Sequence, residues 1–161
     1  MAVSININDQ FLSTTINLLS VNTQLQSDLF PTTNIKKDTD DLRIYAADIN
    51  LPEIEETIFP RVIVEVENVQ TVQNLQQPMI SMHDIFFAVH VWVRDEEGGD
   101  PMLGVLEDDV RTALLGQFVN GIHFIGGFAL EQPSGYMKER DQETSAWHAM
   151  LKFFLQSAYL Q

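Results

Sequence analysis

The sequence predicts an α+β fold: an antiparallel β-sheet of about four main strands with two helices packed on one face. Two long runs, Ser81–Arg94 and Ser145–Gln156, alternate apolar residues with more polar ones, as half-buried strands do. Two other segments repeat apolar residues at three- and four-residue steps, which is typical of amphipathic helices. The elements follow in the order helix, long loop, two strands, helix, two strands, and this grouping favours the α+β class.

The first helix is expected over residues 9–29, where apolar residues recur on one side until Pro31 ends the pattern. Residues 32–60 then form a long loop or arm without clear periodicity. Loops of this length in compact domains are usually functional, so we expect the arm to order against a neighbouring subunit. Within it, Ile44 and Tyr45 belong to a segment that could form a short strand or a turn of helix.

The rest of the chain, 61–161, supplies the sheet and the second helix. Arg61–Glu67 reads as a strand with its valines on one face, and the stretch Asn68–Gln77 is either a hairpin tip or an extended excursion. In Ser81–Arg94 the odd-numbered residues form a continuous apolar face, whereas the even-numbered residues form a mixed one. The closing strand repeats this division. A sheet whose second face is only half polar usually packs against a partner surface.

Local signals mark the boundaries of the remaining elements. Asp100 is expected to cap the second helix and Gly116 to end it. A strand over Ile122–Leu130 contains Gly126-Gly127, which suggests a β-bulge. The polar stretch Met137–Thr144 then leads into the last strand.

Composition limits the possible functions. The chain has 161 residues, which predicts one domain, 1–161, and 45% of them are hydrophobic, enough for a substantial core. With a net charge of −14, the general surface should not bind nucleic acid, because phosphate neutralisation needs clustered cations. The charge either serves solubility or keeps the protein near DNA without sticking to it. We find no secretory signal and no membrane-spanning run, so no membrane partner is expected.

No residue pattern points to catalysis. The chain lacks cysteine, phosphate-binding loops and nucleotide-binding fingerprints, so we predict no catalytic, cofactor-binding or metal-binding residues, no cofactor and no enzyme. His90 and His148 could be neighbours on adjacent strands, but a metal site would need a third ligand. The alternative is a small-ligand binding domain or enzyme with a pocket between sheet and helices, lined by His90, Trp92 and His148.

The mixed face of the sheet is the candidate site for subunit or partner contacts, because aromatic residues and Met are enriched at interfaces. The other interpretation is a second small core under the arm or the first helix. With two residues of the arm included, the candidate interface residues are Ile44, Tyr45, Phe86, Trp92, Met150 and Phe154.

After the first helix, the chain contains in order the segments FPRVIVEVEN, HDIFFAVHVWVRDEE, VLEDDVRTALLGQ, GIHFIGGFALEQPSG and MKERDQETSAWHAMLKFFLQ. The order and character of these segments resemble the tail terminator (tail completion) proteins of long-tailed bacteriophages. The resemblance covers roughly Phe59 to the C-terminus, with the first helix in outline, and the segment Thr32–Pro60 departs from the more compact family pattern.

The resemblance implies a structural virion protein of the tail or neck, assembled in the host cytoplasm. Such proteins form a homohexameric ring that caps the tail tube protein and joins the head-side connector or stopper protein, and DNA passes through without specific binding. Alternatives are a head-completion (stopper) protein or another neck, tube or baseplate component. The resemblance makes the acidic clusters candidate bore or loop residues, namely Asp38, Asp40, Asp41, Asp95, Glu96 and Glu97.

Overall fold

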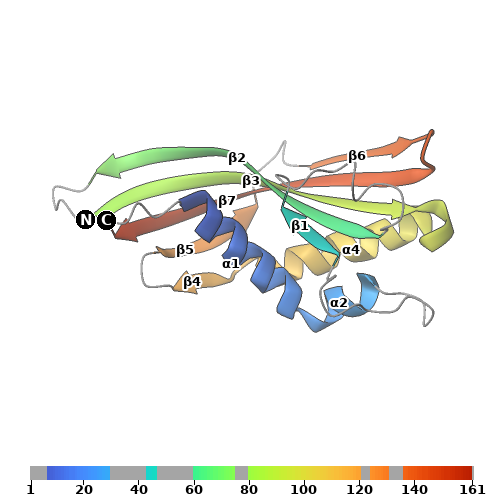
Figure 1. Cartoon of the computed structure of the whole chain (residues 1–161), viewed down its shortest axis with the longest axis horizontal. Helices are drawn as coiled ribbons and strands as arrows, with labels where there is room; N and C mark the ends of the chain where they lie inside the picture. Colours follow the sequence, from blue (N-terminus) through green and yellow to red (C-terminus); the bar gives the residue numbers. More distant parts are fainter. Residues whose placement is uncertain are drawn as a thin grey trace.

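A computed structural model describes residues 7–29, 43–46, 60–74, 80–120, 124–130 and 136–160 of the chain (Figure 1). The helical elements are α1 (Ile7–Val21), α2 (Thr23–Leu29), the short 3-10 helix η1 (Asp95–Glu97) and α4 (Gly99–Leu114). The strands are β1 (Ile44–Ala46), β2 (Arg61–Asn74), β3 (Ile80–Arg94), β4 (Phe118–Asn120), β5 (Phe124–Leu130), β6 (Tyr136–Asp141) and β7 (Ala146–Leu160).

All the strands belong to one seven-stranded sheet, with the order β1-β2-β3-β7-β5-β4. Every described pairing is antiparallel except that of β1 with β2, which is parallel. β6 pairs with the same edge of β7 as β5 does, next to the first half of β7, while β5 lies along the second half. The predicted α+β class with long antiparallel central strands is confirmed, and three short strands extend the sheet.

The helices cover one face of the sheet, and the core lies between the two layers (Figure 1). Phe87 of β3 stands at its centre: its ring lies 4.7 Å from the ring of Phe11 on α1 and 5.5 Å from that of Phe153 on β7. Burial of an aromatic side chain of this size contributes about 1.5–3 kcal/mol, so this cluster anchors α1 to the sheet. The fully buried residues that β3 and β7 contribute to this core are Ile85, Phe87, Val89, Val91, Val93, Ala149, Leu151, Phe153 and Leu155.

The expected single helix 9–29 is instead two helices, because the chain breaks at Asn22. The Asn22 side-chain oxygen accepts a hydrogen bond of 2.9 Å from the Leu25 backbone N–H. This is the N-cap arrangement, which satisfies a backbone donor that a new helix start would leave free. The break lets Leu25 and Leu29 of α2 reach the core from a second direction.

Other boundaries differ from the expectations by local chemistry. The helix α4 begins at Gly99 after Gly98, whose φ of 114° only glycine adopts easily, so Asp100 lies in the first turn and is not the cap. Gly116 follows the helix with φ 77°, as expected of a C-terminal glycine. Gly126-Gly127 pairs regularly with β7 and forms no bulge. The register shifts instead occur in β2, between Val66 and Asn68 and between Thr71 and Gln73.

The described part of the arm 32–60 is short. Ile44–Ala46 forms β1 and pairs with β2 of its own chain, so here the arm adds a strand to the sheet. Residues 32–42 and 47–59 lie outside the described residues, and so does the expected ordering of that part against a neighbour. Among the described helices, none is both long and apolar enough to span a bilayer.

Candidate functional site

The sheet face opposite the helices, here called the outer face, collects most of the predicted interface residues. Strand alternation turns the even-numbered residues of β3 and β7 away from the core. The register then sets Phe86 opposite Phe154 and His90 opposite Met150. Their side chains are half-buried, and the rings of Phe86 and Phe154 lie 6.1 Å apart. The two central strands therefore bring these predicted residues, together with Trp92, onto one surface.

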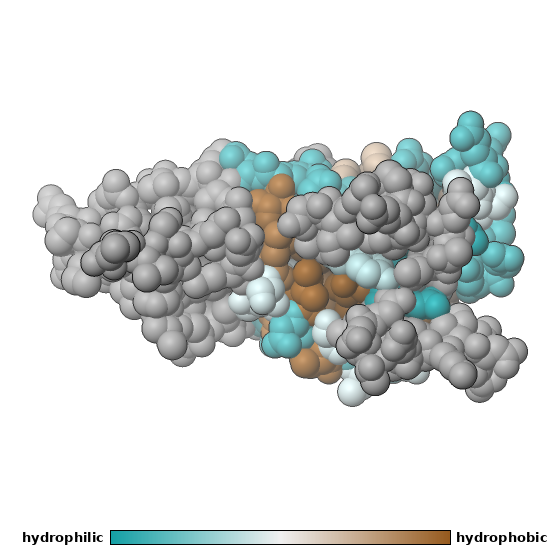
Figure 2. All heavy atoms as spheres, viewed as in Figure 1, coloured by the Kyte–Doolittle hydropathy of each residue, from teal (hydrophilic) through white to brown (hydrophobic). Residues whose placement is uncertain are grey.

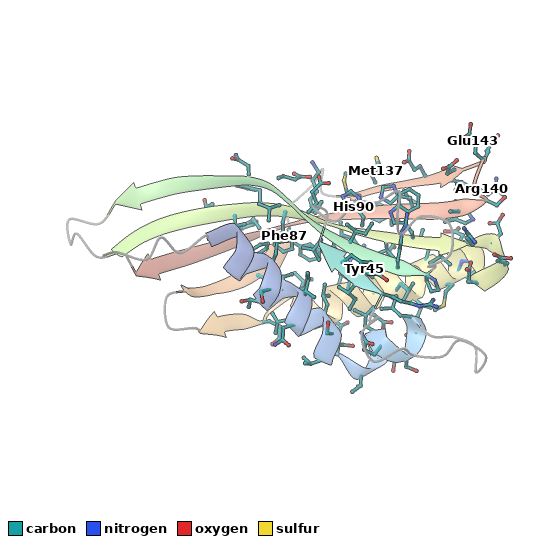
Figure 3. All side chains as sticks on the ribbon, in the orientation of Figure 1. Tyr45, Phe87, His90, Met137, Arg140 and Glu143 are labelled. Carbon is teal, nitrogen blue, oxygen red and sulfur yellow. The ribbon has the colours of Figure 1, made fainter. Side chains whose placement is uncertain are left out.

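The two predicted interface residues of the arm, Ile44 and Tyr45, lie on opposite faces of the sheet. Tyr45 lies opposite Ile63 of β2, which in turn lies opposite His90, so Tyr45 extends the outer face (Figure 3). Ile44 lies opposite Val62 and is only 7% exposed, because it packs in the core under the helices. Ile44 is thus a core residue of this chain and does not belong to the outer face.

β6 adds residues that the sequence did not predict. Met137 of β6 lies opposite Met150 and Glu139 lies opposite His148, so the outer face continues across a strand expected to be a polar connection. Met137 is 37% exposed, more than its neighbours on β3 and β7. The sequence feature that could have predicted β6 is a hairpin: the six residues Tyr136–Asp141 pair with the start of β7 across a four-residue turn that precedes Ala146.

A polar cluster occupies the centre of the outer face (Figure 3). The His148 ring stacks on Trp92 with centroids 4.0 Å apart, and the Arg61 guanidinium lies 5.6 Å from the Trp92 ring. His90 Nδ1 and His148 Nε2 are 2.8 Å apart, a hydrogen-bonding distance. The expectation that the two histidines could be neighbours is confirmed.

Two carboxylates flank the histidine pair. His148 Nδ1 lies 3.3 Å from Glu139 Oε1, and His90 Nε2 lies 3.8 Å from Glu65 Oε2. The row thus runs Glu65, His90, His148, Glu139 across β2, β3, β7 and β6. Burial, and next the neighbouring His148, lower the pKa of His90 to about 4. Burial also lowers the pKa of His148, although Glu139 opposes this, so both rings are neutral at pH 7.

The predicted acidic residues after β3 form a different site at the end of the sheet. Asp95 accepts a hydrogen bond of 2.6 Å from Arg140 Nη2 and another of 2.9 Å from Trp147 Nε1, and the former is the main reason that the pKa of Asp95 is lowered. Glu96 pairs with Arg94 at 3.6 Å. Burial raises the pKa of Glu97. Asp38, Asp40 and Asp41, the other predicted acidic residues, lie outside the described residues.

The end of the molecule that carries η1 is polar. Hydrophilic residues gather there, over η1 and the β6–β7 hairpin, and the hairpin turn carries Glu143 at its tip (Figures 2 and 3). An open depression lies in this region. It is lined by Arg94, Asp95, Glu96, Thr144 and Ser145.

Polar side-chain contacts join β6 to α4 and η1. Tyr136 donates a hydrogen bond of 2.9 Å to Glu107, and Lys138 lies 2.8 Å from Asp100. With the Arg140–Asp95 ion pair, three side chains from alternate residues of β6 contact the helical elements. Alternation explains the pattern, because Tyr136, Lys138 and Arg140 share the helix side of the strand.

The geometry does not favour the alternative pocket between sheet and helices. His90, Trp92 and His148, its expected lining, lie on the face turned away from the helices and contact one another. Within the described ranges, no three His, Cys, Asp or Glu side chains gather as a metal site would need. The outer face thus combines half-buried aromatic and Met side chains with a polar centre.

Comparison with known proteins finds a solved structure with a similar fold. No protein-family model matches the chain, and no curated protein matches its sequence. Among solved structures, the chain is similar to a protein chain in the virion of a native gene transfer agent particle, with 13% sequence identity and a TM-score of 0.64. The match covers 96% of this chain and 99% of the other. At this identity the likeness shows a shared fold over nearly the full length of both chains.

Proposed function

We propose that this chain is a structural component of a phage-like virion and, more specifically, a tail terminator that acts without catalysis. In this proposal a homohexameric ring caps the tail tube and joins it to the head-side connector. The supporting observation is the near-complete overlap of the fold with a chain of a gene transfer agent virion, at a TM-score of 0.64. The sequence resemblance to tail terminators does not depend on that structural match, and it is the reason for proposing this particular virion component.

The outer face supports a role in packing between subunits. It presents half-buried aromatic and Met side chains around a polar centre, a composition enriched at protein interfaces. Ring closure requires a head-to-tail contact between two different surfaces of the same chain. The outer face is the candidate for one of them, and its interface residues are Tyr45, Phe86, Trp92, Met137, Met150 and Phe154.

The charge distribution supports passage of DNA without binding. Five Lys and Arg side chains on the described surface are engaged by carboxylates of the same chain, and these are Arg94, Arg111, Lys138, Arg140 and Lys152. Cations held in this way are not free to cluster on a phosphate backbone. With a net charge of −14, the chain as a whole would repel DNA.

Negative-stain electron microscopy of the protein with purified tail tubes tests the proposal. Six-fold rings, or caps at one end of each tube, are the expected result. A protein that joins the connector but ignores tubes would instead favour a head-completion or stopper protein. Single particles that ignore both would argue against a neck component altogether.

A pair of variants tests the outer face. Phe154→Ser should weaken ring or cap formation at least tenfold in the concentration required, because a buried aromatic contact is typically worth about 1.4 kcal/mol or more. Val105→Ser, which removes an exposed apolar side chain from α4, is the control and should leave assembly unchanged; Val105 is 43% exposed. Equal effects of both variants would place the contact elsewhere.

A further inference from the structure

The histidine pair on the outer face has hydrogen positions that its neighbours dictate. The oxygen of the ionised Glu139 can only accept, so the His148 nitrogen that lies 3.3 Å from it, Nδ1, must carry a hydrogen. In a neutral imidazole the other nitrogen then has none, so His148 Nε2 is an acceptor. His90 Nδ1, 2.8 Å away, must therefore be the donor of the bond between the rings.

One nitrogen is left without a hydrogen or a partner. With the hydrogen of His90 on Nδ1, its Nε2 carries a bare lone pair, and this atom is buried with no hydrogen-bond partner among the described residues. The nearest polar group is the carboxylate of Glu65, at 3.8 Å, which is itself an acceptor. A hydrogen placed on this nitrogen would turn a contact between two acceptors into an ion pair.

We propose that His90 and His148 form a one-proton switch that links β2 to β6 across the outer face. In the neutral state the hydrogen bonds run from His90 through His148 to Glu139 and stop short of β2. A single added proton resides on His90 Nε2 and draws Glu65 into the row. The positive charge is shared, because the hydrogen between the rings can sit on either nitrogen. The protonated row is then bonded continuously from Glu65 to Glu139.

The charged groups around the histidine pair determine which anions are available to a protonated ring. Arg61 of β2 lies near the Trp92–His148 stack and lowers the pKa of His148. Lys152 of β7 is paired with Glu67 at 3.5 Å, and Arg94 of β3 with Glu96 at 3.6 Å. From β1, Tyr45 joins the same face beyond Ile63. The carboxylates of Glu65 and Glu139 are thus the anions that face the pair directly.

The switch takes up one proton and resists a second. Two protonated rings would set two N–H groups against each other across 2.8 Å and break the bond between them. Burial delays the first proton, since it lowers the pKa of His90 to about 4. The row is therefore open toward β2 at neutral pH and closes in acid, when the outer face loses one uncompensated negative charge.

Nitrogen-15 NMR of the two imidazoles tests the proposal on the intact chain without any variant. At about pH 7.5 both rings should be neutral and carry their hydrogen on Nδ1. On acidification the two rings should report one shared transition with a midpoint well below 6.5, the ordinary value for histidine. A hydrogen on Nε2 of either neutral ring, or two separate transitions near 6.5, would overturn the proposal.

Two glutamine substitutions on β2 test the role of Glu65. Glu65→Gln should lower the shared midpoint by about half a pH unit or more, because the new ion pair is lost. Glu67→Gln removes the same charge from the same strand but contacts Lys152, so it should shift the midpoint much less. Equal shifts in the two variants would show a general charge effect and contradict a specific closure onto Glu65. Both residues lie on the surface side of the strand, so both variants are expected to fold.

Discussion

The two faces of the same central strands are stabilised in different ways. On the inner face, the odd-numbered residues from Ile85 to Val93 of β3 and from Ala149 to Leu155 of β7 are all apolar and fully buried against the helices. On the outer face, the residues between them form stacked rings and a hydrogen-bonded histidine pair, which lies 3.3 Å from Glu139 at one end and 3.8 Å from Glu65 at the other. The inner face depends on apolar area and tolerates little change of volume, whereas the outer face depends on protonation. We therefore expect a change of side-chain volume to affect mainly the inner face and a change of pH to affect mainly the outer face.

The largest contrast should come from two adjacent phenylalanines of β3. Phe87→Ala should lower the free energy of unfolding by about 3–5 kcal/mol, because it leaves a cavity at the centre of the core. Phe86→Ala, one residue earlier on the half-buried outer face, should cost about 1–2 kcal/mol. Urea unfolding followed by circular dichroism measures both. Equal losses would mean that the two faces are equally covered in the free chain.

Acid should act on the outer face through His90. Its pKa in the folded chain is about 4, below the ordinary 6.5 that applies when the chain is unfolded. The unfolded chain therefore binds more protons between these values, so the stability contribution is complete above 6.5 and is lost as the pH falls toward 4. The loss should be about 2–3 kcal/mol.

His90→Gln isolates this effect, since it removes the titrating group. The difference in unfolding free energy between wild type and variant should shrink by about 2 kcal/mol between pH 7 and pH 4. Denaturant titrations at several pH values measure it. A difference that stays constant over this range would show that His90 does not carry the acid response.

The helix layer should respond to pH with the opposite sign, by a smaller amount. Burial, and next a hydrogen bond to Asp28 of α2, raise the pKa of Asp109 on α4 from 3.8 to about 7. The contribution of this group is present below 3.8 and lost as the pH rises through about 7. Asp109→Asn should therefore stabilise the protein by about 1–2 kcal/mol at about pH 8 and have little effect at about pH 5. Asp108→Asn, at an exposed position, is the comparison variant and should show a much smaller pH dependence, because the Asp108 charge makes only the smallest contribution to the raised pKa of Asp109.

The inner face could be predicted from the sequence, whereas much of the outer face could not. The period-two pattern identified the core residues of β3 and β7 because burial itself selects apolar side chains. The nearness of His90 and His148 followed from the same alternation. Their carboxylate partners did not, because Glu139 lies on β6, whose sequence YMKERD has no apolar alternation to mark a strand. β6 is a strand because its backbone pairs with β7, and the pattern of apolar and polar residues within β6 does not reveal that pairing.

The ends of elements show the same limit. The break at Asn22 depends on one side chain turning back to a backbone N–H, and the start of α4 depends on the positive φ of Gly98. Asn22 and Gly98 are common residue types, so their identity alone could not fix these boundaries. The sequence of the three-residue strand β1 is compatible with both a strand and a helical turn, because its pairing with β2 depends on residues distant in the sequence.

The manner in which β6 is attached has a consequence for how the molecule opens. Its residues pair with a neighbour close in sequence, and its side chains reach α4 and η1 through ion pairs and a hydrogen bond, with no buried apolar residue among them. Such a segment can detach with little loss of apolar burial, so its amides should exchange with solvent through local openings that spare the rest of the sheet. We therefore expect β6 to open separately from the rest of the sheet and to be more sensitive to ionic strength than the core.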